Sequence, residues 1–307
     1  MKATCVANSN IAFVKYWGKK DDSLNIPMNP SISMTLDLNT TTTVEFSRNF
    51  KEDEFILNNK FQKGEKLVRV IKFLDIARRK ANIHQKARVF SVNGFPTASG
   101  IASSASGFAA LAGAVSKVLG LSLDKRDLSE LARQGSGSAC RSIYGGFVEW
   151  SDKYAVQIKD YDFWPEIRDV IVIVEEKEKL ISSREGMKQT VLNSRLYKKR
   201  LKSIQTTLDI VKKSILDKNF PVLAEEIMKE SDNMHACIEE VGIKYLNEES
   251  LRIKEKIKKL NRQELTAGYT FDAGANAHII TLEKYLPRIT GIIKNYKIIK
   301  PGQGVQI

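Results

Sequence analysis

The sequence contains a stretch of 28 residues, from Val89 to Ser116, without a single charged side chain. Charged residues make up 28% of the chain, so about eight would be expected in a segment of this length. Pro96 and four glycines interrupt the stretch, which excludes a membrane-spanning helix. A small-residue segment of this kind is therefore either buried in the core or uses its backbone to bind a ligand.

The middle of this stretch, residues 96–107, is rich in Ser, Ala and Gly and leads into a helix predicted from about Ser104 to Leu119. Small residues allow a loop to approach a ligand closely, and the first N–H groups of a helix are unpaired and partly positive. That arrangement binds phosphate. No Gly-Lys-Ser/Thr follows, so the segment is not a Walker A loop. The alternative is a Ser-rich cap on a buried, Ala-rich helix.

A second small-residue segment runs from Gly135 to Ser142 and contains Arg141. Gly and Ser before an arginine are typical of an anion cradle, since a guanidinium can bind phosphate oxygens with two parallel hydrogen bonds. The alternative is a flexible turn with a surface arginine.

Two single residues stand out by their surroundings. Lys15 ends an apolar segment beside Tyr16 and Trp17, where it is either partly buried and paired with an acid or extends past the aromatic rings to water. Asp272 lies among small residues at the end of a predicted strand, a suitable place for an acid or base, although an Asx turn or a helix N-cap would explain it equally well.

The segment 182–187 opens a long helical region. Ser182 or Ser183 is expected to cap the helix, with Glu185 in its first turn, while Arg184 can face a ligand. We interpret the three isolated histidines as structural residues, and the basic runs at 198–202 and 254–259 as solvated helix faces. The histidines are His84, His235 and His278.

The order of patterns predicts two α+β halves with a boundary at Trp164–Pro165, which gives domains of residues 1–165 and 166–307. Asp37–Asn39 resembles a turn before a strand from Thr40 to Phe46, and helical spacing dominates from Ser183 to about Leu260. Further strands are predicted at 3–15, 88–92, 146–150, 171–174, 266–271, 277–281 and 297–299, and further helices around 67–74 and from 124 to about 135.

The chain carries a net charge of +13 and three cysteines that are far apart. Lysines are spread over the helical patterns with glutamates between them, which argues against a nucleic-acid surface. The first ten residues contain no apolar signal core, and no run of 18 apolar residues exists. We therefore expect a cytoplasmic protein that binds neither membranes nor nucleic acids.

Taken together, these segments resemble known families. Residues 96–105 fit the phosphate loop of the GHMP kinases, which reads Pro, three residues, Gly, an aliphatic residue, one residue and Ser-Ser-Ala. The other segments resemble one branch of that superfamily, the diphosphomevalonate decarboxylases. The matching stretches are NIAFVKYWGKK (10–20), GSGSACRSIYGGFVEW (135–150), SSREGM (182–187) and TFDAGANA (270–277), with MNPSISMTL (28–36) and SDNMHACI (231–238) also similar.

This resemblance implies a two-domain GHMP kinase fold, with an N-terminal half like domain 2 of ribosomal protein S5 and an α/β C-terminal half. It also implies an enzyme that uses ATP and Mg²⁺ to phosphorylate the 3-hydroxyl of mevalonate 5-diphosphate. Loss of phosphate and CO₂ then gives isopentenyl diphosphate for isoprenoid biosynthesis. The family is often homodimeric, so the resemblance also implies a homodimer.

The resemblance assigns roles residue by residue. Asp272 would take the hydroxyl proton, and Lys15 would orient Asp272. Substrate binding would fall to Tyr16, Ser136, Ser138, Arg141, Ser183 and Arg184. The ATP phosphates would be held by Pro96, Ser99, Gly100, Ile101, Ala102, Ser103, Ser104 and Ala105. The metal ligands are not assigned, although Ser104 is the obvious candidate.

Three alternatives remain open. Related proteins decarboxylate mevalonate 5-phosphate, and the motifs do not distinguish one phosphate from two. Others phosphorylate the 3-hydroxyl without decarboxylation, but they lack the Lys and Asp partners that Lys15 and Asp272 match. A basic nucleic-acid-binding protein, or a non-catalytic relative, is the alternative from a different class.

Overall fold

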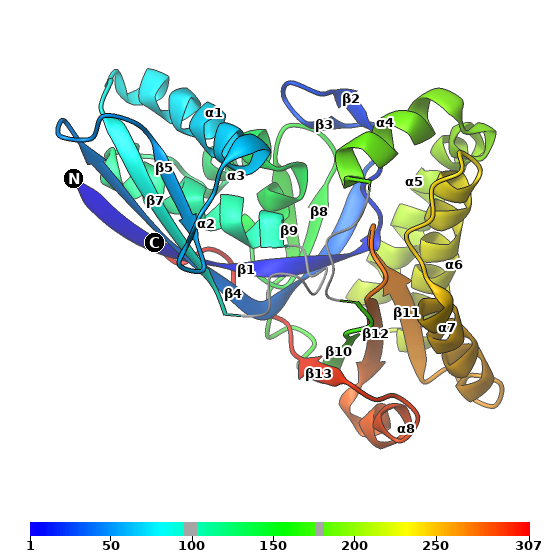
Figure 1. Cartoon of the computed structure of the whole chain (residues 1–307). Coiled ribbons are helices and arrows are strands. Elements are labelled where there is room, and N and C mark those ends of the chain that lie inside the picture. Colours follow the sequence, from blue (N-terminus) through cyan, green and yellow to red (C-terminus); the bar gives the residue numbers. More distant parts are fainter. Residues whose placement is uncertain (95–102, 176–180) are drawn as a thin grey trace.

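The computed structural model of the chain describes residues 1–94, 103–175 and 181–307. Two main sheets organise the fold, and each is built from one half of the chain (Figure 1). The first contains β1 (Lys2–Val14), β4 (Ser31–Ser47), β5 (Glu54–Leu57), β6 (Lys60–Phe61), β7 (Lys86–Asn93), β8 (Phe147–Trp150) and β9 (Ala155–Lys159). The second contains β10 (Ile167–Val172), β11 (Ala267–Phe271), β12 (Ala277–Leu282) and β13 (Tyr296–Ile299).

The strand order of the first sheet is β6-β5-β7-β4-β8-β9, with β1 paired to β4, and that of the second is β11-β12-β10-β13. Most neighbours are antiparallel, and β5 with β7 is a parallel pair. A short ribbon of β2 (Lys19–Asp21) and β3 (Ile26–Pro27) lies between β1 and β4 in the chain. This arrangement confirms the expectation of two α+β halves.

The expected turn at Asp37–Asn39 is wrong, because β4 continues through it as a single strand of 17 residues. Asp37 and Asn39 are exposed, whereas Leu36 and Leu38 are buried. The polar residues thus occupy the solvent face of an alternating strand. The residue types suited a turn, but the period-2 pattern decided the conformation.

The charge-free stretch is explained in large part by burial. Helix α2 (Ser103–Val118) packs against the first sheet together with α1 (Gly64–Ala81) and α3 (Lys125–Gly135) (Figure 1). Ala105, Ala109 and Ala112 of α2 are fully buried. A Cβ atom added at Gly113 would lie 2.4 Å from Cys5 Sγ, so only glycine allows this close approach between helix and sheet.

The second sheet is covered by a helical layer. Helices α6 (Phe220–Glu239) and α7 (Glu248–Leu260) contact the sheet directly. Helix α5 (Arg195–Leu216) packs on α6, α4 (Ser183–Asn193) contacts α5 and α6, and α8 (Leu286–Thr290) lies at one end (Figure 1). One hydrophobic core joins the two halves: Ile11 and Met34 of the first sheet pack with Leu208 of α5 and Ile280 of β12. Lys15 follows β1 directly and therefore emerges at this shared core.

The end of the chain returns to the first sheet. Val6 pairs with Gln306, and Leu36 pairs with Pro301. The last seven residues are thus packed on the first half although they follow the second half in the sequence.

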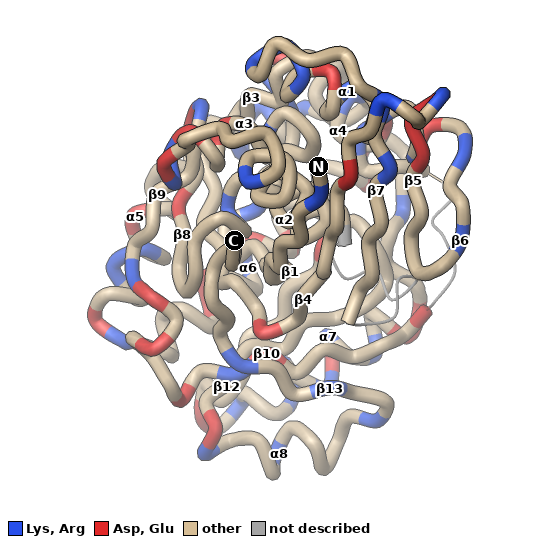
Figure 2. The backbone as a smooth tube through the Cα atoms, turned by 90° about the vertical axis from the view of Figure 1, so that its left-hand side faces the viewer, with Lys and Arg blue, Asp and Glu red and all other residues tan. Residues whose placement is uncertain are grey.

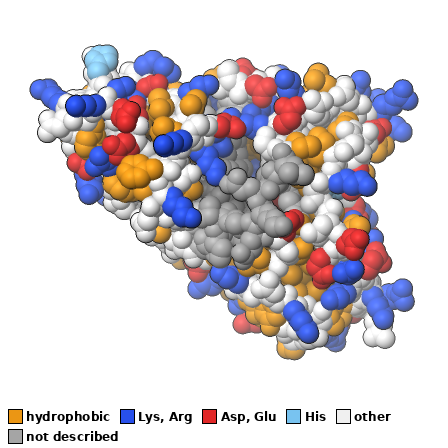
Figure 3. Space-filling model, in the orientation of Figure 1, with side chains coloured by type: hydrophobic (Ala, Val, Ile, Leu, Met, Phe, Trp, Pro, Cys, Tyr) orange, Lys and Arg blue, Asp and Glu red, His pale blue; other side chains and the backbone are white. Residues whose placement is uncertain are grey.

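The surface carries mixed charge. Lys, Arg, Asp and Glu are interspersed along the chain in Figure 2, and basic and acidic side chains alternate across the face shown in Figure 3. Such mixing differs from the basic stripe that a nucleic-acid surface requires. Within the three described ranges, no helix is both long enough and apolar enough to cross a bilayer.

Candidate active site

The structure brings Lys15 and Asp272 together at the seam between the halves. The distance between Lys15 Nζ and Asp272 Oδ1 is 2.7 Å. Lys15 is 1% exposed, whereas the Asp272 side chain is 34% exposed and reachable from solvent. Asp272 directly follows β11, so the ends of two strands from different sheets supply the pair. The interpretation of Lys15 as a residue that extends past the aromatic rings to water is wrong.

Burial and the neighbouring charges shift the pKa of each member of this pair in opposite directions. Burial alone would raise the pKa of the Asp272 carboxyl, but the nearby charges of Lys15, His278 and Arg141 together hold it below its usual value. Burial lowers the pKa of the Lys15 ammonium, against the attraction of Asp272 and Glu230. Asp272 is therefore an ionised carboxylate at neutral pH, ready to accept a hydrogen bond from a hydroxyl.

Arg141 is a buried residue and not a surface arginine in a flexible turn. It lies in a 3₁₀ helix (Gly137–Ile143) and is 3% exposed. Its Nη1 donates to Ser31 Oγ at 2.8 Å, and its Nη2 donates to Asn10 Oδ1 at 3.0 Å. Burial lowers its pKa, and the charge of Asp272 opposes that shift. A fixed guanidinium thus faces the site from the N-terminal half.

Further hydroxyl groups lie on the segments next to Arg141 and Lys15. Ser136 Oγ lies 3.4 Å from Ser104 Oγ, which places the Gly135–Ser142 segment beside the first turn of α2. Ser138 is partly exposed. The Tyr16 ring packs on Trp150 with centroids 4.6 Å apart, and its buried hydroxyl has no hydrogen-bond partner among the described residues. Burial raises the pKa of Tyr16, so this hydroxyl is a donor at neutral pH.

The start of α4 forms another side of the site. Ser182 caps the helix by accepting a hydrogen bond from the Glu185 N–H at 3.2 Å, as predicted, and Ser183 and Arg184 follow in the first turn. Arg184 is exposed. Its charge depresses the pKa of two further cations, Lys19 and Arg69, after the larger effect of their own burial, and the pKa of Arg69 falls to about 10.

Lys19 and Arg69 were missed by the sequence analysis. Lys19 belongs to the 10–20 motif, which was the available signal, but only Lys15 and Tyr16 were selected from it. Arg69 belongs to α1, a helix from which no site residue was selected. Arg69 Nε is buried without a partner among the described residues. Lys19, Arg69 and Arg184 form a cluster of cations. The carboxylates of Asp22, at 3.2 Å from Lys19 Nζ, and of Glu65 balance it only in part, so the cluster favours an anion.

A cavity of about 220 Å³ opens beside this cluster of cations. Its apolar lining includes Phe55, Val89 and Phe108, and Arg69 and Ser104 contribute polar groups. The further lining residues are Thr40, Leu57, Lys66, Val70, Ser91, Asn93, Gly107 and Leu111. An apolar slot with cations and a helix N-terminus at one end suits a flat ring that carries phosphates.

Most of the predicted phosphate loop cannot be compared with the structure. Pro96, Ser99, Gly100, Ile101 and Ala102 lie outside the described residues. Ser103 begins α2, and Ser104 is exposed in its first turn. The Ala105 side chain is fully buried, so this residue can offer a ligand only its backbone.

Three other expectations hold only in part. Lys198, Lys199 and Lys202 of the basic run 198–202 are exposed, as a solvated face requires, but Arg200 is 2% exposed and pairs with Glu230. Lys254 in the second basic run pairs with Asp232 at 2.7 Å. His278 is not isolated, because its Nδ1 lies 2.6 Å from Asp169 Oδ2. In each case the partner comes from a distant part of the sequence.

Comparison with known proteins identifies the family. The model of the diphosphomevalonate decarboxylase-like N-terminal domain matches residues 7–159, and that of the mevalonate 5-diphosphate decarboxylase C-terminal domain matches residues 169–304. The chain belongs to the diphosphomevalonate decarboxylase family. The diphosphomevalonate decarboxylase of Candida albicans is 40% identical over 98% of this chain and 90% of its own length. The human diphosphomevalonate decarboxylase is 40% identical over 91% of this chain and 76% of its own.

Solved diphosphomevalonate decarboxylases share the fold over the whole chain. The mevalonate diphosphate decarboxylase of Staphylococcus aureus gives a TM-score of 0.94 at 36% identity, with 99% of this chain and 97% of the other covered. A structure described as "MDDEF in complex with MVAPP, AMPPCP and Magnesium" gives a TM-score of 0.95 at 36% identity, with 100% and 98% covered. The GHMP kinase-like fold expected from the resemblance is thereby confirmed.

Proposed function

We propose that this chain catalyses the ATP-dependent decarboxylation of mevalonate 5-diphosphate to isopentenyl diphosphate, with release of ADP, phosphate and CO₂. The observation that carries the proposal is the Lys15–Asp272 pair, 2.7 Å apart and flanked by the buried Arg141. A carboxylate that faces solvent while its ammonium partner is buried can receive a proton from a bound hydroxyl. The names of the solved relatives, which include complexes with MVAPP and a nucleotide analogue, support the same substrates.

The nucleotide is assigned to the 220 Å³ cavity. Its purine ring would lie between the apolar residues, and its phosphates would reach the first turn of α2, where Ser103, Ser104 and the backbone N–H of Ala105 lie. The assignment of Pro96, Ser99, Gly100, Ile101 and Ala102 to the ATP phosphates stays a prediction. Arg69 would balance the charge of the phosphates from the opposite wall.

The residues at this position fit a magnesium ion. Mg²⁺ is commonly held by one or two protein oxygens together with waters and substrate phosphates, and Ser104 presents an exposed hydroxyl in the first turn of α2. When bound, the ion would neutralise charge on the ATP phosphates.

The isoprenoid substrate is assigned to the seam between the halves, beside Lys15 and Asp272. Arg184 and Lys19 would hold its diphosphate with the hydroxyls of Ser136, Ser138 and Ser183. Arg141, already fixed by Asn10 and Ser31, would face the carboxylate. The unpartnered Tyr16 hydroxyl would donate a further hydrogen bond. Because both substrates are polyanions, bringing them together requires this number of positive groups and donors.

The reaction then follows from positions and charges. The 3-hydroxyl of the substrate donates its proton to Asp272 as its oxygen forms a bond to the γ-phosphorus, and the bond to the bridging oxygen of ADP breaks. Lys15 keeps the carboxylate oriented and balances its charge. The C3–O bond next breaks with loss of phosphate. The C–C bond to the carboxylate supplies the electron pair of the new double bond, and CO₂ leaves.

A substrate panel tests the proposal. The purified protein with ATP and Mg²⁺ receives mevalonate, its 5-phosphate or its 5-diphosphate, and ADP and CO₂ are recorded together. Equal ADP and CO₂ from the diphosphate alone is the expected result. Equal ADP and CO₂ from the monophosphate would show that mevalonate 5-phosphate is the substrate. ADP without CO₂ would identify a 3-kinase. No ADP with any compound would overturn the proposal.

Three coarser assignments accompany this function. We propose domains of residues 1–165 and 166–307, supported by strands β1–β9 and β10–β13 in separate sheets. Limited proteolysis would test the boundary. We also propose a cytoplasmic homodimer by analogy with the family, to be tested by light scattering and by cell fractionation.

A further inference from the structure

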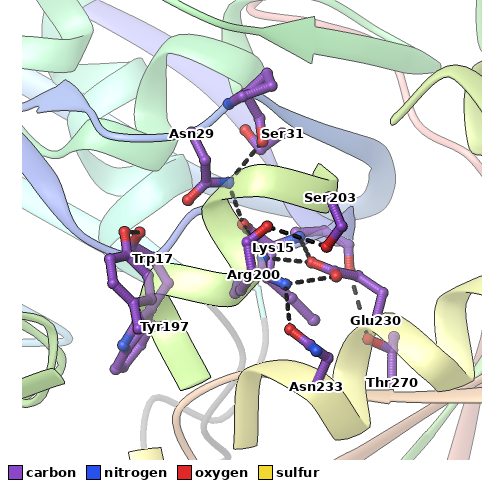
Figure 4. Close-up of polar contacts among 12 residues, drawn as sticks. Lys15, Trp17, Asn29, Ser31, Tyr197, Arg200, Ser203, Glu230, Asn233 and Thr270 are labelled. Carbon is purple, nitrogen blue, oxygen red and sulfur yellow. Dashed lines mark hydrogen bonds and ion pairs between the residues drawn. The ribbon is translucent and has the colours of Figure 1, made fainter. Parts of the chain in front are cut away.

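The peptide of Lys15 is held on both sides by a buried ion pair from the C-terminal half. The Lys15 N–H donates to Glu230 Oε1 at 2.8 Å, and Arg200 Nη2 donates to the Lys15 carbonyl at 3.0 Å (Figure 4). Arg200 lies on α5 and Glu230 on α6. The two side chains also bind each other, with Nη1–Oε2 at 2.6 Å and Nη2–Oε1 at 2.5 Å. The result is a closed ring of hydrogen bonds through one peptide.

This ion pair is almost completely shielded from water. The side chains of Arg200 and Glu230 are 1% and 2% exposed. Removing two charges from water costs several kcal/mol, so a buried ion pair is often no more stable than apolar residues of similar volume. We therefore expect the Arg200–Glu230 pair to contribute by fixing the position of a neighbouring group. The group to which both side chains bind is the peptide of Lys15.

The segment after β1 is fixed at further points, by α5 and by the residues that precede β4. Tyr197 Oη of α5 donates to the Trp17 carbonyl at 2.5 Å, and Asn29 Nδ2 donates to the Lys15 carbonyl at 2.9 Å. On α6, Ser231 Oγ accepts the Phe271 N–H at 3.0 Å, one residue before Asp272. Helix α6 thus binds the backbone at Lys15 and next to Asp272, although these residues come from different halves.

We propose that the Arg200–Glu230 ion pair positions Lys15, and that without it the ammonium does not stay at hydrogen-bond distance from Asp272. Arg200 and Glu230 are positioning residues, since they touch neither substrate nor reacting atoms. A displacement of about 1 Å at a reacting group lowers a rate by about 100-fold. The proposal rests on the proposed function, because its test measures kcat of that reaction.

The proposal also predicts a change in pH dependence. The charged or titratable groups that act on Asp272 are Lys15 from the end of β1, Arg141 from the 3₁₀ helix, His278 from β12 and His235 from α6. Lys15 contributes most to holding the pKa of Asp272 down against burial. If Lys15 moves away, the pKa of Asp272 rises, because burial is then opposed by fewer positive charges. The acid limb of kcat, where Asp272 becomes protonated, then moves to higher pH.

The test uses the double variant R200M/E230L, which removes the ion pair while keeping apolar volume. After the wild type is shown to turn over, we expect the variant to fold, to keep KM for ATP within about threefold, to lose about 100-fold in kcat and to show the displaced acid limb. An unchanged kcat, or a lower kcat with an unmoved acid limb, would overturn the inference. An inactive wild type would instead overturn the proposed function.

Three further variants make the outcome specific. R78M/D53L is the matched control: it removes another buried ion pair, whose Asp53 likewise accepts a backbone N–H, from Ala87 at 2.8 Å. It should leave kcat and the acid limb unchanged, and an equal effect there would count against the proposal. R200M/E230Q keeps an acceptor for the Lys15 N–H and should recover part of the lost kcat. No recovery would also contradict the proposal.

The single variant R200K tests the proposal if the double variant R200M/E230L does not fold. It keeps the buried charges balanced but cannot present two N–H groups of one guanidinium to Glu230 and to the Lys15 carbonyl together. We expect it to fold, with kcat lowered and the acid limb moved in the same direction by a smaller amount. Wild-type kinetics in R200K would overturn the inference.

Discussion

Lys15 Nζ donates to Asp272 Oδ1 at 2.7 Å although 257 positions separate the two residues in the sequence. Lys15 directly follows β1 of the N-terminal sheet, and Asp272 directly follows β11 of the C-terminal sheet. The proposed chemistry therefore depends on how the two halves pack. A shared hydrophobic core between β1, β4, α5 and β12 keeps that packing fixed.

Replacement of Asp272 by Asn should separate binding from chemistry. The amide occupies the same volume but cannot accept the hydroxyl proton, so we expect turnover to fall by about 100-fold or more. ATP binding, measured by calorimetry, should be unchanged. Asp217→Asn, an exposed acid paired with Lys213 on α5, is the control. Turnover of Asp272→Asn within tenfold of the wild type would remove Asp272 from its assigned role.

Replacement of Arg141 by Gln should lower kcat/KM for the isoprenoid substrate by about 100-fold or more, since it removes a charged donor aimed at a charged substrate. Steady-state kinetics check this result. The control is Arg88→Gln, which removes an exposed arginine paired with Glu54. Normal kinetics for the Arg141 variant would show that its guanidinium serves only Asn10 and Ser31.

Gly107 offers a test of the nucleotide cavity that does not depend on turnover. It lies in α2, lines the cavity, and a Cβ added there would meet no atom of the described residues within 4 Å. Gly107→Ala should stabilise the helix by up to about 1 kcal/mol with little effect on ATP. Gly107→Leu should also fold but should weaken ATP binding at least about tenfold, roughly 1.4 kcal/mol. Unchanged ATP affinity in the leucine variant would place the purine elsewhere.

His235 should make the stability of the fold depend on pH. Burial, followed by the charge of Lys15, lowers its pKa from 6.5 to about 4. Between these values the unfolded chain binds a proton that the folded chain does not, so stability is complete above about pH 6.5 and falls as pH decreases towards 4. The slope approaches about 1.4 kcal/mol for each pH unit.

Denaturant unfolding at pH 7 and pH 5 measures this effect. The wild type should lose about 1.8 kcal/mol more than His235→Phe over that interval. His84→Gln, at an exposed position, should behave as the wild type does. If the wild type and His235→Phe lose equal stability, the imidazole does not titrate as its burial requires.

The fold was predictable wherever a local pattern repeats over several residues. The helix of residues 103–118, the cap at Ser182 and the strand of residues 267–271 all follow from periodicity and capping residues. The turn expected at Asp37–Asn39 was wrong because two polar residues on the exposed face of a strand have the same composition as a turn. Polarity alone does not distinguish the two.

The motifs predicted the main residues of the site, but not the residues that hold them in position. Lys15, Arg141 and Asp272 stood out by their surroundings, whereas Arg200 was hidden in a basic run and Glu230 in a charged helix. No local signal marks Arg200 and Glu230, because their partners are each other and a peptide 185 to 215 positions away. The pairing of His278 with Asp169 likewise depends on the register between β12 and β10, which the sequence does not show.

By itself the sequence determined the elements, the two halves and the residue types suited to phosphate and to proton transfer, since periodicity, capping and small-residue loops are local properties. Only the tertiary structure decided which charges are buried and which ion pairs form. Burial and hydrogen bonding depend on surfaces that meet after the chain has packed. That is why the same residue type, a lysine or an arginine in a charged run, is solvated at one position and fixes the active site at another.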